Sequence, residues 1–398
     1  MQPVRLTSGH YIIIFFYAFT PFLYFLKPFE MSYPIISILL RIAEPLLILC
    51  LGVLLLRRFI RISKFKFDVY LICLILFSIY GVILGFIMNN EPRYIISGFV
   101  HILTGLLCYS YFKYEGAGEP VFALFMRHMV YITVPFYVFA IGFLYVSNKF
   151  LGTSYYIGLD CPILLLALFW FLQQKKAVYM LLIAGLIFLS GKRGILLVGI
   201  LGTVFATFTY PFSKSLLYIR SALIVAVGIV VLQFSGVNVI DQISNSKVYE
   251  KVTSAANNDI NFYSAGRLEE ITSALDEWTS NPAKITFGSG LGFSYTFKYE
   301  DYSLPDDEDY HNIHFSPLNI LLIWGAPISI LLALLLATKF WELRGSLSGV
   351  LGIGRLTVIS LLAYSCFVFN IFQEPMLWTL VGMFSALKNT ASRVGIST

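Results

Sequence analysis

The sequence predicts an all-α polytopic integral membrane protein with about 12 transmembrane helices and one large, partly helical loop between spans nine and ten. Hydrophobic residues make up 58% of the 398 residues and charged residues only 13%, whereas soluble domains are about 45–50% apolar and about 25% charged. Apolar runs close to the length of a membrane span recur along the chain, and acidic residues concentrate in one polar segment. This composition argues against a soluble enzyme, a disordered chain and a nucleic-acid-binding protein.

The predicted spans are apolar runs that approach the ~20 residues a helix needs to cross the hydrocarbon core. They are residues 11–27, 34–56, 68–88, 94–112, 121–147, 157–172, 177–190, 194–210, 216–232, 315–338, 355–372 and 375–388. We therefore divide the chain into residues 1–232 with nine spans, a large loop at 233–313, and residues 314–398 with three spans.

The charge distribution predicts the orientation of these spans. Residues 233–313 hold 13 acidic and 5 basic residues, which leaves 9 acidic and 23 basic residues for the rest of the chain. Basic groups lie between spans two and three, six and seven, and ten and eleven, and at the C-terminus. Because short cytoplasmic loops are rich in Lys and Arg, we expect both termini to lie inside and the acidic loop outside.

A basic hairpin joins spans seven and eight and breaks this charge rule. It reads Ser190-Gly191-Lys192-Arg193-Gly194, and the predicted orientation places it outside. Cations beside lipid are costly unless they face a polar cavity or headgroups. The hairpin is either an anion site suited to a lipid phosphate or an interfacial pair whose charges snorkel to the headgroups.

The loop contains a predicted amphipathic helix over residues 264–278. Leu268, Ile271, Leu275 and Trp278 recur at helical spacing on one face. Arg267 lies in the first turn, where a cation opposes the helix dipole, so an anionic partner is expected. That partner is either a ligand phosphate held by the guanidinium and the helix-start amides or the carboxylate of Glu270.

The rest of the loop offers glycines, acids and two histidines. The run from Gly288 to Gly292 lacks the strand–turn–helix setting of a nucleotide loop, so we interpret it as a turn. Acidic residues 306–309 are a solvated charge run rather than a metal site. His311 and His314 suit general-base chemistry on a hydroxyl, and the alternative is an interfacial histidine bonded to loop backbone.

Ionisable residues also occur within the predicted spans. Arg41 and Glu44 are three residues apart and are expected to pair on one helix face. His101, Arg127 and His128 lie at membrane depth or near a span end, where ionisable groups point to function. Their roles stay open at this point.

Taken together, these motifs resemble the family of O-antigen polymerases and ligases. The family's Ser-x-Ser-Arg-Gly-like hairpin corresponds to residues 190–194, with Lys192 as a departure, and Gly266-Arg267 precedes the loop helix as family members have it. A Gly-x-Gly turn follows, and the family's His lies eleven residues before a Gly in the next span, as His314 lies before Gly325. His311 has the family's Asn neighbour but lies fourteen residues before that glycine, so it is the second choice.

The resemblance implies a metal-independent glycosyltransferase of the bacterial inner membrane, with no cofactor and a periplasmic active site. Its donor would be an oligosaccharide on undecaprenyl diphosphate. The implied catalytic residues are His314, His311, Arg267 and Arg193, and the implied substrate-binding residues are Arg193, Arg267, Lys192, Ser190 and Gly290. The implied partners are the lipid bilayer and a chain-length regulator, without nucleic acid.

The leading interpretation is an O-antigen polymerase that joins lipid-linked repeat units. The nearest alternative is an O-antigen ligase that transfers finished glycan to the lipid A core. A transporter or flippase is more distant, because paired halves with broken helices at matching positions are not evident in the sequence.

Overall fold

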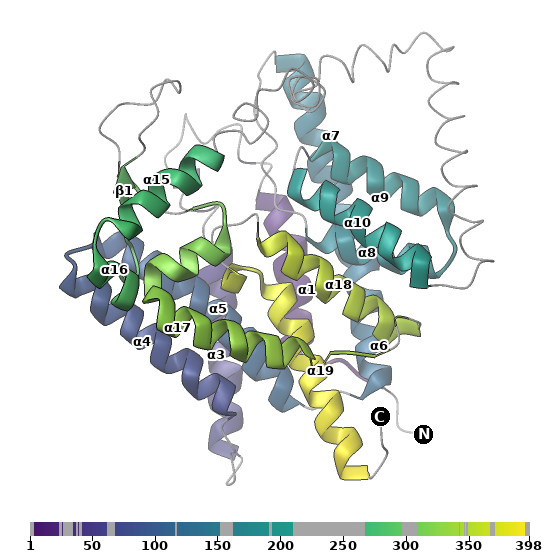
Figure 1. The fold of residues 1–398 in the computed structure, drawn as a ribbon. Coiled ribbons are helices and arrows are strands. Elements are labelled where there is room, and N and C mark those ends of the chain that lie inside the picture. The colour runs from purple at the N-terminus through teal and green to yellow at the C-terminus, as the bar shows by residue number, and fades with distance from the viewer. Residues whose placement is uncertain are drawn as a thin grey trace.

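The computed structural model describes residues 4–23, 26, 35–36, 39, 42–61, 68–115, 118–151, 162–190, 193–209, 267–296, 309–311, 313–341, 343–345, 347, 349–366 and 371–394. Within these residues the protein is almost entirely helical (Figure 1). The helices are α1 (Ser8–Leu23), α3 (Ala43–Arg61), α4 (Val69–Ile87), α5 (Pro92–Glu115), α6 (Glu119–His128), the π-helix η2 (Met129–Thr133), α7 (Val134–Leu151), α8 (Ile163–Gln173), α9 (Ala177–Leu189), α10 (Arg193–Thr209), α15 (Arg267–Thr279), α16 (Pro282–Phe287), α17 (Ser316–Trp341), α18 (Gly349–Ser365), the 3₁₀-helix η3 (Ile371–Gln373) and α19 (Pro375–Val394). Strands β1 (Tyr295–Thr296) and β2 (Asp309–Tyr310) pair antiparallel, with Tyr295 opposite Tyr310.

Most of the long helices overlap a predicted span, but α18 runs from Gly349 to Ser365 instead of over the predicted 355–372, whose last residues belong to the separate helix η3. Four are long and apolar enough to cross a membrane: Val69–Ile87, Pro92–Glu115, Glu119–Leu144 and Ser316–Trp341. Ser8–Leu23, Ile163–Gln173, Ala177–Ile187 and Gly349–Ser365 are shorter apolar helices. The predicted span 216–232 lies outside the described residues, as do residues 233–266, 297–308 and 312 of the predicted loop, so the number of spans, the extent of the loop and the character of the acidic run 306–309 stay predictions.

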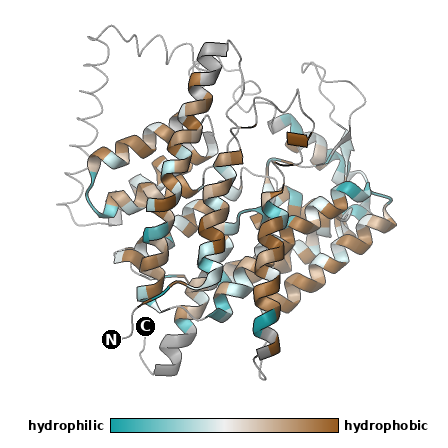
Figure 2. Ribbon diagram, turned by 180° about the vertical axis from the view of Figure 1, so that it is seen from behind, coloured by the Kyte–Doolittle hydropathy of each residue, from teal (hydrophilic) through white to brown (hydrophobic). Residues whose placement is uncertain are grey.

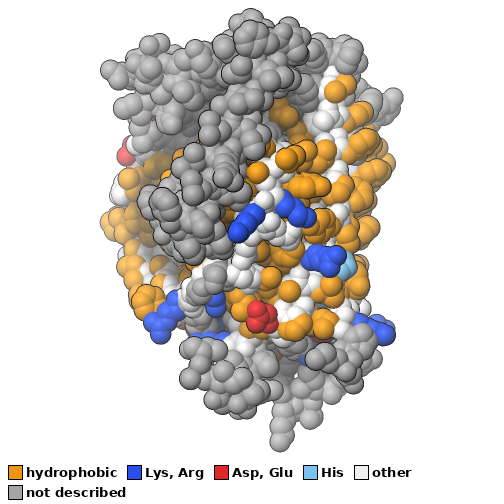
Figure 3. All heavy atoms as spheres, turned by 90° about the vertical axis from the view of Figure 1, so that its right-hand side faces the viewer, with side chains coloured by type: hydrophobic (Ala, Val, Ile, Leu, Met, Phe, Trp, Pro, Cys, Tyr) orange, Lys and Arg blue, Asp and Glu red, His pale blue; other side chains and the backbone are white. Residues whose placement is uncertain are grey.

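Helix α4 illustrates how these sequences divide between the protein interior and lipid. Asp68 caps its N-terminus by accepting a hydrogen bond from the Tyr70 amide. Its outward side chains are exposed and apolar: Val69, Ile72, Ile75, Leu76, Ile79, Ile83, Phe86 and Ile87. An all-apolar exposed stripe is unfavourable in water and is what a lipid-facing helix presents. Figure 2 shows hydrophobic residues along the lengths of the long helices, and hydrophobic side chains cover much of the described face in Figure 3. The chain is a multi-pass helical membrane protein.

Helix α5 lies inside the bundle and packs closely against α19. An added Cβ at Gly382 would lie 2.6 Å from the Tyr109 carbonyl oxygen, and one at Gly105 would lie 3.0 Å from the Trp378 ring. Small residues at such crossings let two helix backbones approach, which is the usual route to helix association in membranes.

Helix α17 is broken at Gly325, which adopts φ 71° and ψ 169°. The break frees carbonyl groups that the helix would otherwise use, and each needs a donor because lipid supplies none. The Ser329 hydroxyl donates to the Ile320 carbonyl at 3.0 Å, and the Gly290 amide donates to the Ile323 carbonyl at 3.0 Å. The amide of Ser289 donates to the Leu322 carbonyl at 2.7 Å.

The glycine-rich run is a turn, as predicted, and it wedges between helices. Gly288, Gly290 and Gly292 all have positive φ, from 75° to 83°. A Cβ at Gly288 would lie 2.4 Å from the Ile323 carbonyl oxygen, and a Cβ at Gly325 would lie 2.5 Å from that of Thr286. We call this backbone-to-backbone contact of Gly288 with Gly325 the glycine interlock. It fixes the start of α17 against α16.

The same turn is held against the α4–α5 corner. The amide of Leu291 donates to the Gly81 carbonyl at 2.8 Å, and the Asn90 side-chain amide donates to the carbonyls of Ser289 and Leu291 at 2.8 and 2.9 Å. The Leu291 side chain packs against Gly98, since a Cβ added at Gly98 would lie 3.1 Å from it. The turn is therefore a structural joint among α4, α5 and α17.

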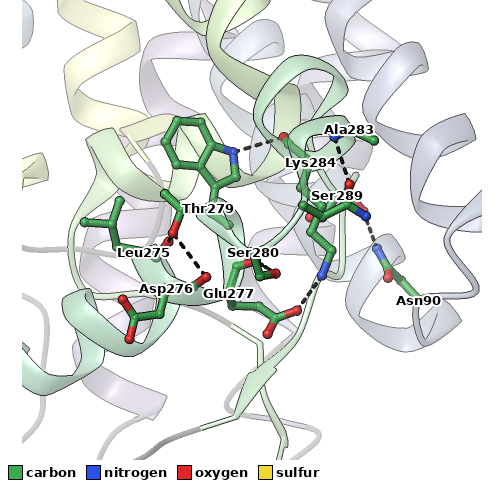
Figure 4. A network of polar contacts seen from close by, with 11 residues as sticks. Asn90, Leu275, Asp276, Glu277, Thr279, Ser280, Ala283, Lys284 and Ser289 are labelled. Atoms are coloured by element: carbon green, nitrogen blue, oxygen red, sulfur yellow. Dashed lines mark hydrogen bonds and ion pairs between the residues drawn. The ribbon is translucent and has the colours of Figure 1, made fainter.

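Helix α15 is anchored to α16 by the polar contacts drawn in Figure 4. The Trp278 indole donates to the Lys284 carbonyl at 3.0 Å, and the Lys284 ammonium pairs with Glu277. At the corner between the two helices, the Asn281 side chain caps α16 by accepting a hydrogen bond from the Ala283 amide at 2.9 Å. These contacts tie α15 to the rigid glycine turn.

The predicted apolar face of α15 is only partly correct. Ile271 and Trp278 pack against the core, but Leu275 is 40% exposed. The buried face instead carries Ala274, Ser273 and the two acids Glu269 and Glu270. Simple apolar periodicity failed here because the helix buries a carboxylate that has specific hydrogen-bond donors.

The opposite end of the bundle, which we call the basic end, holds a buried charge cluster. Asp68 pairs with Lys113 and, at 3.0 Å, with Lys339, and it accepts from the Tyr109 hydroxyl at 2.7 Å. Burial raises the pKa of Asp68, but the hydrogen bonds from Lys113, Tyr109 and Lys339 outweigh burial and hold that pKa well below its usual value. The cluster joins the start of α4 to the ends of α5 and α17.

Candidate functional site

The candidate site is at the end of the bundle that carries α15, α16 and the two strands, in the upper left of Figure 1. Its centre is a histidine–carboxylate contact between His314, just before α17, and Glu270 of α15. The His314 Nδ1 lies 3.1 and 3.2 Å from the two carboxylate oxygens of Glu270. The His314 backbone amide donates to Glu270 Oε1 at 3.0 Å.

Strand β1 contributes a third group. The Tyr295 hydroxyl donates to Glu270 Oε1 at 3.2 Å, and Tyr295 is buried. The Glu270 side chain is 10% exposed, whereas that of His314 is 42% exposed. The carboxylate is therefore enclosed, and the imidazole reaches the surface. Such a ring can accept a proton from a bound hydroxyl.

His311 has a different environment. Its ring stacks on Tyr94 at 3.6 Å between centroids, and its Nδ1 lies 3.3 Å from the Phe293 carbonyl oxygen and 3.4 Å from that of Gly292. The guanidinium of Arg93 lies 4.5 Å from the centre of the Tyr94 ring. His311 thus fastens the glycine turn to the start of α5, as the interfacial alternative anticipated for one of the two histidines.

The structure places the remaining predicted site residues in two regions. Arg267 is the first residue of α15, one helical turn before Glu270, and its side chain lies outside the described residues. Ser190 follows α9 and Arg193 begins α10, while residues 191–192 lie outside the described residues, so the form of the hairpin stays a prediction. Lys192 and the side chain of Arg193 lie outside the described residues. Figures 1 and 2 place α9 and α10 on the other side of α1 and α18 from α15 and α16.

Two predicted substrate-binding residues have internal partners. Gly290 is buried against α4, where a Cβ would lie 2.2 Å from the Gly85 amide nitrogen. The buried Ser190 hydroxyl donates to the Ile187 carbonyl at 2.7 Å. Packing thus accounts for the glycine, and a helix-end hydrogen bond engages the serine; their roles toward a substrate stay predictions.

Ionisable groups within the spans also have partners. Glu44 lies 3.0 Å from the His101 Nδ1 and accepts from the Thr104 hydroxyl at 3.0 Å. Arg41, its predicted partner, lies outside the described residues. His128 Nδ1 lies 2.8 Å from the Leu124 carbonyl oxygen, and Arg127 is exposed on α6. Glu44 therefore links α3 to α5.

Among the described residues, no group of three or more His, Cys, Asp or Glu side chains is arranged to hold a metal ion. The arrangement offers a proton acceptor, His314, beside the first turn of a helix that begins with an arginine. Sequence reasoning missed Glu270 and Tyr295 as partners of His314. The only sequence signal was the placement of Glu270 three residues after Arg267, which suggested a different pair.

These features define a polytopic helical membrane protein with a histidine–carboxylate centre at one end of its bundle. The family model described as O-antigen ligase matches residues 178–333, which confirms the resemblance over that segment. The matched segment runs from α9 through α15 to α17 and includes every site residue named from the sequence. Comparisons with curated proteins and with solved structures find no match to this chain.

Proposed function

We propose that this protein is a glycosyltransferase that polymerises lipid-linked repeat units of a surface polysaccharide, an O-antigen polymerase. The observation that carries the proposal is His314 paired with Glu270 inside the segment that matches the O-antigen ligase family. The donor is an oligosaccharide on undecaprenyl diphosphate, and the acceptor is the sugar of another such molecule.

In the proposed reaction, an acceptor hydroxyl oxygen attacks the anomeric carbon of the donor. The bond between that carbon and the diphosphate oxygen breaks, and its electron pair leaves with undecaprenyl diphosphate. His314 takes the hydroxyl proton. Arg267 and Arg193 bind the diphosphate and stabilise the charge that develops on it, so the arginines supply the positive charge without a metal.

The position of Arg267 supports its part in this proposal. A guanidinium and the backbone amides at the start of α15 together favour an anion. Arg193 has the same combination at the start of α10. The two helix starts belong to different parts of the fold, so each arginine needs its own test.

The environments of the two histidines support His314 as the base. Its ring faces a carboxylate that can stabilise the imidazolium formed during proton transfer, whereas the Nδ1 of His311 faces backbone carbonyls and its ring stacks on Tyr94. We expect His314→Gln to lower the turnover number about 10²- to 10⁴-fold, the usual contribution of general-base catalysis.

The test uses purified protein in lipid nanodiscs with an undecaprenyl-diphosphate oligosaccharide. Growth of the glycan is followed for the wild type, His314→Gln, Arg267→Ala and Arg193→Ala. His128→Gln is the matched control, because His128 lies on α6 and contacts only the Leu124 carbonyl among the described contacts. Full activity of His314→Gln at equal folded yield contradicts the proposed base.

The second function is an O-antigen ligase, which the description of the matching family favours. The two functions differ in acceptor. In a deletion strain, lipid A carrying one repeat unit indicates a lost polymerase, and lipid A carrying none indicates a lost ligase. If the protein is a transporter or flippase, the purified system will show no glycan growth, with or without the substitutions.

A further inference from the structure

We propose that Glu270 and Tyr295 act as positioning residues that hold His314 in one tautomer, with the proton on Nδ1 and the lone pair on Nε2. The inference rests on the proposed function, because it assigns these two side chains to the proton transfer that His314 performs there. It differs from the pairing of Glu270 with Arg267 that the sequence suggested.

The hydrogen bonds that reach the Glu270 carboxylate determine which ring nitrogen of His314 carries the proton. Three groups approach Glu270 Oε1: the His314 amide at 3.0 Å, the His314 Nδ1 at 3.1 Å and the Tyr295 hydroxyl at 3.2 Å. An ionised carboxylate only accepts hydrogen bonds. The Nδ1 must therefore be the protonated ring nitrogen, and the neutral ring then carries its lone pair on Nε2.

Two contacts to the same carboxylate also restrict the rotation of the His314 side chain. The backbone amide and the ring of His314 bind the same carboxylate, so the side-chain rotation of His314 is restricted from both ends. Tyr295, on strand β1, also donates a hydrogen bond to this carboxylate, and β1 is itself paired with β2. An imidazole that is oriented in this way loses little entropy when a hydroxyl arrives.

The Glu270 carboxylate also offsets the positive charge that forms on His314 during proton transfer. When His314 accepts the hydroxyl proton it becomes a cation, and the adjacent Glu270 carboxylate, whose side chain is only 10% exposed, stabilises that cation. A second carboxylate oxygen, Oε2, lies 3.2 Å from Nδ1 and keeps this contact if the ring shifts. Removing the negative charge should thus slow the proton transfer while leaving donor binding, which we assign to arginines, unchanged.

The experiment measures the tautomer and the kinetics separately. The protein has five histidines, so ¹⁵N-histidine labelling gives a tractable spectrum, and the loss of one signal set in His314→Gln assigns the ring. Above the pH at which the ring is protonated, the His314 signals should show Nδ1–H. Glu270→Ala should convert them to a mixture of both tautomers.

The kinetic readout uses Glu270→Gln and Tyr295→Phe, which preserve shape. We expect kcat to fall about tenfold or more for Glu270→Gln and by a smaller factor for Tyr295→Phe, with less than about a twofold change in KM for the donor, because replacing the hydrogen-bond partner of a metal-bound histidine costs about 10–100-fold in other proteins. Glu277→Gln is the control, since Glu277 lies on the same helix about two turns after Glu270 and pairs with Lys284.

Three results overturn the inference. One is a His314 tautomer that is unchanged in Glu270→Ala, and another is wild-type kcat in Glu270→Gln while His314→Gln is inactive. The third is a rise in KM for the donor as large as the fall in kcat, which indicates that the binding site has collapsed. If instead His314→Gln retains full activity, the assignment of His314 as the base fails as well, whereas the proposed function itself fails only if the wild-type protein extends no glycan.

Discussion

The glycine interlock predicts a large and specific stability cost for the substitution Gly325→Ala. Gly325 has φ 71° and ψ 169°, a region that only glycine populates readily, and forcing another residue there costs about 1–3 kcal/mol. The new Cβ would also lie 2.5 Å from the Thr286 carbonyl oxygen and 2.7 Å from the Gly288 amide nitrogen. Overpacking of this kind adds about 1–3 kcal/mol, so the expected loss of unfolding free energy is about 2–6 kcal/mol.

The matched control for this substitution is Gly142→Ala. Gly142 lies in α7, is exposed, and an added Cβ there meets nothing within 4 Å. Alanine is a better helix former than glycine by about 1 kcal/mol in water, so this variant should be neutral or slightly more stable.

The assay is reversible unfolding in mixed micelles, followed by tryptophan fluorescence, with Trp324 directly beside the substituted residue. The double variant Gly288→Ala/Gly325→Ala should cost less than the sum of the two single variants, because either Cβ already forces the same backbone segments apart. Equal unfolding free energies for Gly325→Ala and Gly142→Ala, within about 0.5 kcal/mol, would refute the reasoning.

Three further predictions concern the α15–α16 corner, the basic end and the orientation of the bundle. Trp278→Phe removes the indole hydrogen bond to α16 and should lower the unfolding free energy by about 0.5–1.5 kcal/mol, whereas Trp341→Phe, at an exposed position, should change it little. The lowered pKa of Asp68 means that its stabilising contribution is complete above its unfolded pKa of about 3.9 and is lost as the pH falls below that value; acid titration of unfolding should show this loss, and a decline of the same size in Asp68→Asn would contradict it. In a variant without native cysteines, Ser280→Cys should react with an impermeant maleimide in intact cells and Arg344→Cys only after permeabilisation, and the opposite pattern would invert the predicted orientation.

Much of the helical architecture could be predicted from the sequence because span length and hydropathy are local properties. The bilayer requires long apolar helices, and α4, α5 and α17 each follow a predicted run within a few residues. The glycine turn was also predictable, because glycine's backbone freedom acts over a few residues. The helix predicted over 264–278 is observed from Arg267 to Thr279, and residues 264–266 lie outside the described residues. Burial along α15 was less predictable, because Leu275 is exposed and Glu270 is buried.

The sequence by itself determined that this chain is a multi-pass membrane protein with an arginine-led helix and a histidine ahead of a later apolar helix, and it pointed to the family that matches residues 178–333. Only the tertiary structure decided that Glu270 contacts His314 rather than serving only as a helix neighbour of Arg267, since the two partners are separated by 44 residues. Only the fold likewise gave Gly325 its reason, because the contact that excludes a side chain there comes from Gly288 on another segment. Local composition governs where helices form, but the groups that meet across segments are set by how those helices pack.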